Sequence, residues 1–519
     1  MRTKTGLFSL VLLVVTSSLG AQTPELLVKD GTQITGLGAV LSIDYVQVFD
    51  SGGWAALIDT DHPDTARDGA VLRNGLVFLR EGDLLTAPPN TTLDDFDSLS
   101  MSESGNLALC LRASVNGGTR EALYWNTAPV ALRDTILVSP LVGAGTDWEA
   151  FDIVKMNDDN EVFVIGDVIN PAVAGAREST LCKFTLDGAG NVLSTEVLLT
   201  KGQFIPALGT TVVDLPNTEH SLSVNKHGDY ATLIMGLGGT NAIVINGDTI
   251  VAQEGQPSPV AGRIWANLVN IPKVWLNDGG HHIHTGVLSG TGGIYLIAKD
   301  GEKFAQSDDV YPSFSAGTLL PGSAAPVILA NDGNVFWRAG SSLGDDAFLR
   351  NFTPILQEGV TTFLGDLVVG VELTDNAFSV SPDGRFFAGR VDLQLGGEAV
   401  LFVDFGLALP IHGCLGNAGK LQVSNGLALP GNALEFSMDE GNAPGALPFV
   451  VFSMQRFNPA SDCGLVTPIG EFLLSRTHRV GSLALPPWNG SQPTTATMPI
   501  PPDLSLVDQV FFAQGAFHD

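Results

Sequence analysis

The sequence predicts an all-β protein, with a seven-bladed β-propeller followed by a small C-terminal β-sandwich. The first observation is a recurring unit of an apolar residue, a polar turn and a run of strand formers. Its turn residue falls at Gly53, Gly105, Asn160, Gly228, Gly280, Gly333 and Gly384, so the intervals are 52, 55, 68, 52, 53 and 51 residues. The second observation is that tight-hairpin signals alternate with these units. One period therefore contains two hairpins, or four strands, which is the content of a propeller blade.

The hairpin signal is clearest in "AIVINGDTIV", where Asn246 and Gly247 separate two β-prone runs. An Asn-Gly or Asp-Gly pair between such runs favours a two-residue turn, because both turn residues adopt positive φ. Similar pairs are Asn74-Gly75, Asp30-Gly31 and Asp300-Gly301, and the copies at Asn126 and Asn351 lack the glycine. These copies supply the second hairpin of each predicted blade.

The ends of the repeat predict how the ring closes. The hairpin "ELLVKDGTQITG" precedes the first unit, whereas only one obvious strand, "AVLFVDFG", follows the last unit. We therefore expect the N-terminal residues to complete the last blade. The 68-residue interval contains "TLDGAGNVLSTEVLLTKGQ", which we interpret as a longer hairpin or an insertion in blade 3.

Composition and the N-terminus limit the classes of partner. The chain has 55 acidic and 26 basic residues, a net charge of −29, so its surface repels phosphate backbones and nucleic acid is not expected as a partner. Residues 1–21 have the layout of a secretory signal peptide, with basic residues, a short apolar run and small residues before Ala21. No later segment predicts a transmembrane helix. We expect an exported monomer with a propeller over 22–406 and a sandwich over 407–519, either secreted or held in the periplasm or at the cell surface.

The repeats resemble those of tandem-repeat β-propellers in secreted bacterial proteins, most of which are uncharacterised. "SVSPDGRFFAGR" is also similar to the Ser-Pro-Asp-Gly repeat of TolB-like propellers, although the other six copies lack the proline. The region after 406, with an early Gly-Cys and a late "VFFAQGAF", resembles a C-terminal domain of other exported bacterial proteins. These resemblances imply the fold and export, and they name no ligand.

The four cysteines fall into two groups. Cys414 and Cys463 lie in the predicted sandwich, and in an exported chain we expect a disulfide between them. Cys110 and Cys182 lie on strand-like runs of different blades. We favour two buried thiols there over a bridge between blades.

Two clusters are candidate metal sites. "DTDHPD" places Asp59, Asp61 and Asp64 in one loop, where their oxygens could hold Ca²⁺, although a solvated acidic loop is the simpler interpretation. "GGHHIHTG" places His282 and His284 on one face of a strand, where they could bind a metal such as Zn²⁺ with a third ligand, for instance Asp278. Packed histidines are the alternative, and no cofactor is otherwise expected.

No catalytic motif decides whether the protein is an enzyme. "GSSLG" at 340–344 matches Gly-x-Ser-x-Gly, but a strand-like run follows it instead of a helix, which favours an ordinary turn between blade strands. The leading hypothesis is a non-catalytic binding or scaffold module with an unknown protein or glycan ligand. The alternatives are a propeller hydrolase or lyase acting on extracellular polysaccharide, and an envelope-associated structural protein. Acidic side chains from several blades at one mouth of the channel would identify the functional end of the ring.

Overall fold

The computed structural model describes residues 11–17, 24–115, 118–169, 177–269, 273–290, 293–311, 314–315, 317–321, 326–405, 409–412, 420–425, 433–439, 447–453, 465–467, 470–472, 479–486, 494–499 and 509–518. Every regular element in these ranges is a β-strand, which confirms the predicted all-β class. No helix in the described ranges is long and apolar enough to cross a membrane. The chain divides into two compact units, Pro24–Val403 (unit 2) and Met1–Thr23 with Asp404–Asp519 (unit 1).

Unit 2 contains seven antiparallel sheets in sequence order, the blades of the predicted propeller. Blade 1 holds β3 (Gln33–Ile34), β4 (Gly38–Val48), β5 (Trp54–Thr60), β6 (Gly69–Arg73) and β7 (Leu76–Arg80). Blade 2 holds β8 (Thr91–Met101), β9 (Leu107–Val115), β10 (Gly118–Trp125) and β11 (Ala128–Leu132). Blade 3 holds β12 (Asp147–Met156), β13 (Glu161–Ile169), β14 (Arg177–Leu186) and β15 (Val192–Thr200). The long β14–β15 hairpin accounts for the wide repeat interval, as the sequence predicts.

We call β4, β8 and β12 the first strands of blades 1 to 3. In blades 4 to 7 the equivalent strand is interrupted and divided into two short strands. Blade 4 holds β16 (Phe204–Ile205), β17 (Thr210–Asp214), β18 (Leu222–Val224), β19 (Tyr230–Gly236), β20 (Ala242–Ile245) and β21 (Thr249–Gln253). Blade 5 holds β22 (Trp265–Asn267), β23 (Val274–Leu276), β24 (His282–Leu288), β25 (Ile294–Lys299) and β26 (Glu302–Gln306). Blade 6 holds β27 (Leu319–Pro321), β28 (Val327–Leu329), β29 (Val335–Ser341), β30 (Asp346–Arg350) and β31 (Thr353–Gln357). Blade 7 holds β32 (Thr362–Phe363), β33 (Asp366–Val371), β34 (Phe378–Val380), β35 (Phe386–Leu393), β36 (Gly397–Asp404) and the N-terminal β2 (Glu25–Lys29).

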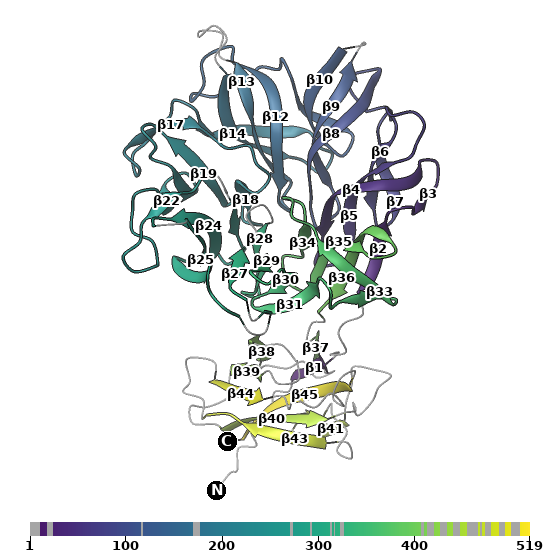
Figure 1. The fold of residues 1–519 in the computed structure, drawn as a ribbon, viewed down its shortest axis with the longest axis vertical. Helices are drawn as coiled ribbons and strands as arrows, with labels where there is room; N and C mark the ends of the chain where they lie inside the picture. Colours follow the sequence, from purple (N-terminus) through teal and green to yellow (C-terminus); the bar gives the residue numbers. More distant parts are fainter. Residues whose placement is uncertain are drawn as a thin grey trace. The chain divides into compact units, whose positions relative to one another are not determined.

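The ring closes through β2, which confirms the predicted use of the N-terminal residues. Strand β2 pairs with β36, so that Glu25 lies opposite Phe402 and Lys29 opposite Ala399. Figure 1 shows this meeting of the first and last strands of unit 2, with green β35 and β36 beside purple β2 to β5. The side chain of Val28 is 2% exposed and belongs to a core cluster shared by blades 7 and 1.

The predicted hairpin at Asp30-Gly31 is wrong. Strand β2 pairs with β36 and β3 pairs with β4, so the two runs belong to different blades. The local Asp-Gly signal predicts a turn correctly, because Gly31 has a φ of +76°. Pairing with the last blade outweighs the local hairpin because it buries the strand on closure of the ring.

The other hairpins form as predicted, and an equivalent hydrogen bond recurs in each of them. Asn246 (φ +51°) and Gly247 (φ +78°) make the turn between β20 and β21, and the Asn246 Oδ1 accepts from the backbone N–H of Tyr230 at 3.0 Å. The equivalent bond in four other blades is accepted by Asn74, Asn126, Asp300 and Asn351. Its donor is the backbone N–H of the first residue of the second strand in the same blade. The turn residue therefore joins the two hairpins of a blade. In blade 1 the turn glycine with positive φ is Gly52 and not Gly53.

We predict that Asn246→Ala lowers the free energy of unfolding by about 2 kcal/mol, because it leaves the Tyr230 N–H without its side-chain acceptor and puts alanine, which lacks asparagine's local hydrogen bonds, in the left-handed region. Asn246→Gly, the matched control, keeps the conformation and loses the same two side-chain bonds, to the Tyr230 N–H and the Asp229 carboxylate, so it is expected to cost about half as much. Chemical denaturation of both variants checks this. Equal losses would show that the conformation carries no part of the effect.

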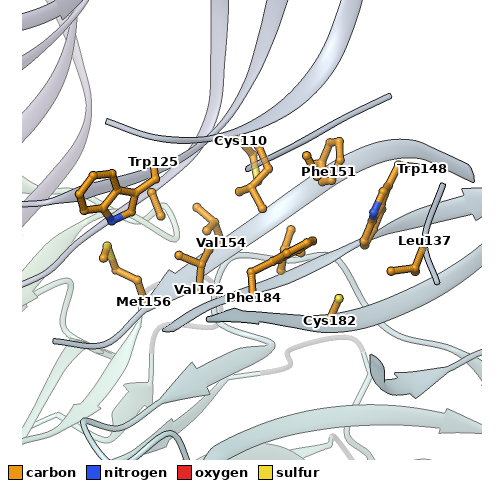
Figure 2. Close-up of a cluster of buried hydrophobic side chains, with 14 of the residues drawn as sticks. Cys110, Trp125, Leu137, Trp148, Phe151, Val154, Met156, Val162, Cys182 and Phe184 are labelled. Atoms are coloured by element: carbon orange, nitrogen blue, oxygen red, sulfur yellow. The ribbon is translucent and has the colours of Figure 1, made fainter. Parts of the chain in front are cut away.

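The blades pack through apolar faces. Between blades 2 and 3 the cluster includes Cys110, Trp148, Phe151 and Cys182 (Figure 2). The Trp148 and Phe151 rings stack at 4.8 Å. Four tryptophans, Trp125, Trp148, Trp265 and Trp337, are buried in these apolar cores.

Unit 1 is also built of strands where it is described. One sheet has the order β37 (Leu409–His412), β1 (Val11–Ser17), β45 (Gln509–His518), β40 (Leu447–Ser453) and β43 (Arg479–Ala484). The others join β38 (Lys420–Asn425), β39 (Ala433–Asp439) and β44 (Thr494–Pro499), and β41 (Leu465–Thr467) with β42 (Gly470–Phe472). The sandwich arrangement and the signal peptide, within which β1 falls, stay predictions.

Candidate functional site

A cavity of about 280 Å³ lies where the first strands of all seven blades meet. Its wall includes residues of β4, β8, β12, β18, β23, β28 and β34 and of the turns that follow these strands. The repeat thus places chemically different residues from seven equivalent positions around one space. Acidic side chains from several blades do converge on this space: Asp50, Glu103, Asp158 and Asp278 all line it.

The acidic side chains come from the second position of the turn that follows each first strand. That position is occupied in blade order by Asp50, Glu103, Asp158, Lys226, Asp278, Asn331 and Pro382, all of which line the cavity. Most of their side chains accept a hydrogen bond from a backbone N–H of the preceding blade. The Glu103 carboxylate accepts from the Asp50 N–H at 2.8 Å, and Asp158 accepts from the Glu103 N–H at 2.7 Å.

The same pattern continues across the closure of the ring. Asp278 accepts from the Lys226 N–H at 2.9 Å, and Asn331 accepts from the Asp278 N–H at 2.9 Å. The Asp383 N–H in blade 7 donates to Asp50 of blade 1 at 2.7 Å. We call the seven residues at this second turn position the mouth ring. Burial, with a hydrogen bond and repulsion from the Asp383 carboxyl, raises the pKa of Asp50 to about 7.

A second set of equivalent positions lies three residues before those of the mouth ring. Some side chains at these positions join neighbouring blades, and others do not. In blade order it holds Gln47, Ser100, Lys155, Ser223, Trp275, Ile328 and Ser379, all of which line the cavity. The four small or amide side chains, Gln47, Ser100, Ser223 and Ser379, each accept from a backbone N–H of the next blade. Lys155, Trp275 and Ile328 replace this joining residue, and therefore give the cavity its own chemistry.

Segments that interrupt the first strands add a charged cluster. Glu219 and His220 precede β18, Lys273 precedes β23, and Asp375 precedes β34. Lys155 pairs with Glu219, and Lys273 pairs with Asp375. The sequence analysis does not predict these residues. The signal that could have indicated them is the extra residues between the two halves of each interrupted strand.

The environment of His220 fixes its protonation. Its Nε2 lies within hydrogen-bond distance of the Asp375 carbonyl oxygen, and because a carbonyl only accepts, Nε2 carries the proton. Burial, followed by the charges of Lys273 and Lys155, holds the pKa of His220 well below its usual range. His220 lines the cavity as a neutral imidazole whose Nδ1 is an acceptor.

A second group of carboxyls has shifted protonation. Asp97 and Asp152 lie at equivalent β-bulges in the first strands of blades 2 and 3. Burial, then repulsion and a hydrogen bond from Glu121, raises the pKa of Asp97 to about 7. Burial, then repulsion from Asp167, raises the pKa of Asp152 to about 6. A protonated carboxyl beside ionised ones is the arrangement of an acid–base pair.

In the predicted calcium loop, each of the three carboxylates accepts a hydrogen bond from a different donor. Asp59 accepts from the Ser42 hydroxyl at 3.2 Å, Asp61 from the Ala39 N–H at 2.7 Å, and Asp64 from the Ala66 N–H at 3.2 Å. Within the described ranges no group of three or more His, Cys, Asp or Glu side chains is arranged for a metal ion. A Ca²⁺ site at Asp59, Asp61 and Asp64 stays a prediction.

The predicted histidine pair does lie on one face of β24. The rings of His282 and His284 stack with centroids 5.8 Å apart. Asp300 contacts His282, whereas Asp278, suggested as a third ligand, belongs to the mouth ring. His284 is 1% exposed, packs against Trp265 at 5.3 Å, and has no hydrogen-bond partner for either ring nitrogen among the described residues.

The remaining predicted residues have simple positions. Cys110 and Cys182 are buried free thiols, which confirms the favoured interpretation. Cys414 and Cys463 lie outside the described residues, so their disulfide stays a prediction. The segment "GSSLG" forms the turn between β29 and β30, and the Ser342 hydroxyl accepts from the Thr318 N–H at 3.0 Å, which is a structural role.

Comparison with known proteins identifies shapes and no relatives. No protein-family model and no curated protein matches the chain. Solved structures similar to it include BBS1N in complex with ARL6DN, with a TM-score of 0.32, 11% identity, and coverage of 74% of this chain and 97% of that one. A prolyl endopeptidase has a TM-score of 0.36, 10% identity and coverage of 80% and 55%. The BP39L lectin from Burkholderia pseudomallei has a TM-score of 0.28, 12% identity and coverage of 74% and 99%. The propeller assignment rests on the strand pairing of this chain itself.

Proposed function

We propose that the chain is an exported binding module whose recognition site is the cavity where the seven blades meet. The observation that carries the proposal is that three of the seven blades lack the side chain that joins the others. Four of seven equivalent side chains are used to join blades, whereas Lys155, Trp275 and Ile328 face the same space without that role. The interrupted strands add His220 and Asp375 at the same place, and Asp375 pairs with the buried Lys273. Residues that leave a structural pattern in a concave site are candidates for recognition.

A ligand panel tests this function with a matched pair of variants. The double variant Lys155→Met/Glu219→Gln replaces an ion pair whose lysine lines the cavity by neutral side chains of similar size. The control Lys303→Met/Asp309→Asn neutralises an ion pair of blade 5 whose residues are not among those that line the cavity. Glycans, small amines and peptides are screened by thermal shift and calorimetry. We expect a ligand of the wild type to bind the control equally and the cavity variant at least about tenfold more weakly. Equal affinity for both variants would place the binding site elsewhere.

A hydrolase acting on extracellular polysaccharide is the second candidate, favoured by the carboxyls at Asp97 and Asp152. At neutral pH the Asp97 carboxyl, whose pKa is about 7, is partly protonated beside Glu121, as a general acid requires. Turnover of chromogenic glycosides that Asp97→Asn abolishes would support it. Saturable glycan binding without turnover would favour the module.

A further inference from the structure

We propose that the cavity recognises a primary ammonium group on an aliphatic chain, carried by a free amine or by a lysine side chain. This inference rests on the proposed function and names the ligand class of the same site. It follows from three properties of the wall: the hydrogen-bonding character of its buried polar atoms, the charge of its mouth, and its apolar surface.

The wall of the cavity includes a neutral histidine, His220, whose second ring nitrogen is an acceptor. His220 is 9% exposed, lines the cavity and uses its Nε2 proton on the Asp375 carbonyl. Its Nδ1 has no partner among the described residues, and the neutral ring has no second proton to offer there. A ligand that reaches Nδ1 must therefore donate a hydrogen bond. The ammonium of Lys155 is already paired with Glu219.

The mouth ring carries an excess of negative charge. Four of its seven positions hold carboxylates, Asp50, Glu103, Asp158 and Asp278, against the single ammonium of Lys226. Each of the first three uses one oxygen for a backbone N–H in the turn of the preceding blade, and a carboxylate can accept more than one bond. Lys155 and Asp375, which also line the cavity, are each paired with an opposite charge, Glu219 and Lys273. A concave site with this charge concentrates cations and repels carboxylate or phosphate ligands.

The apolar part of the wall suits an aliphatic chain. Met101, Met156 and Leu276 line the cavity, and Trp275 adds an aromatic surface. An ammonium near an indole ring gains cation–π attraction. The volume of about 280 Å³ is at the lower end of the range for small-molecule sites. An extended chain of about five methylenes with terminal ammonium groups is thus a suitable probe.

The test is calorimetric titration of the full chain with 1,5-diaminopentane at pH 7.5 and low salt. We expect saturable binding with one site, and none of the isosteric 1,5-pentanediol or of glutarate. Glu103→Gln removes a charge but keeps an oxygen for the Asp50 N–H, and we expect it to weaken binding at least about fivefold. Asp158→Asn is the second such variant, and exposed Glu302→Gln is the control. Because the Asp50 carboxyl has a pKa of about 7, affinity should rise from pH 6 to pH 8.

The outcomes separate the ligand class from the function. Failure of the diamine to bind the wild type overturns the ammonium proposal. If another ligand then binds and is lost in Lys155→Met/Glu219→Gln, the proposed function stands, and if none does, both fall. Equal binding to Glu103→Gln, Asp158→Asn and the control also overturns the ammonium proposal. A parallel titration with the peptide Ac-Gly-Lys-Gly-NH₂ distinguishes the sources, since tighter binding than the diamine identifies a protein lysine.

Discussion

Val28→Asp is expected to destabilise the propeller by about 3 kcal/mol or more, the largest stability effect that the structure predicts for one substitution. Val28 lies on β2, is 2% exposed, and packs in the core shared by blades 7 and 1. An unpaired carboxylate there has no cation to offset its loss of hydration. Because β2 is the only N-terminal strand of blade 7, the loss opens the ring at its closure.

Leu76→Asp is the matched control for this substitution. It makes the same chemical change on β7, the outer strand of blade 1, where Leu76 is 75% exposed, and we expect a change within about 0.5 kcal/mol. Denaturation midpoints compare the two, and hydrogen exchange should rise first in β36. If Val28→Asp were as mild as Leu76→Asp, β2 would not hold the ring closed.

His284→Leu is expected to reduce the loss of stability in acid. Burial, followed by the neighbouring His282, lowers the pKa of His284 to about 3 from a usual value near 6.5. The folded state therefore resists protonation that the unfolded chain accepts, so this contribution is complete above pH 6.5 and is lost between pH 6.5 and 3. By pH 5 the wild type should lose about 2 kcal/mol through His284 alone.

The leucine variant isolates that contribution. Carboxyls with raised pKa, such as Asp50, act in the opposite direction with pH, but they are common to both proteins and cancel in the difference. The substitution also removes two buried nitrogens without hydrogen-bond partners among the described residues, which favours the variant at neutral pH. Exposed His227→Leu serves as the control. Parallel pH profiles of wild type and His284→Leu, measured by denaturation from pH 7.5 to 4.5, would contradict the prediction.

The blades were predictable because turns carry local information. Asn246 and Gly247 need positive φ wherever they stand, so the sequence alone indicates the hairpin and its repetition. Asp30 and Gly31 show the limit of such signals: the turn forms, but the strand before it pairs with β36, more than 360 residues away. Only closure of the whole ring decides that pairing. The sequence names a convergence of acidic side chains at the channel only as the observation that would identify the functional end, and it indicates none of the residues that converge.

The charged cluster could not be derived from any local pattern. Glu219 and Asp375 lie in short segments with no motif, and they meet Lys155 and Lys273 only because four blades bring them to one axis. The histidine pair was predicted to share a face, which it does, because strand alternation is local. That His284 would pack against Trp265 depends on the pairing of β22 with β24 in blade 5, which no local pattern indicates.

The most direct test of a recognition site on the propeller axis is a crystal structure of the full chain grown with 1,5-diaminopentane. We predict one diamine molecule in the cavity, with a terminal nitrogen bonded to the Glu103 or Asp158 carboxylate and the chain along Trp275. The second nitrogen should approach Nδ1 of His220. A diamine bound only at the rim of the blades, or a cavity filled by its own side chains, would contradict the account.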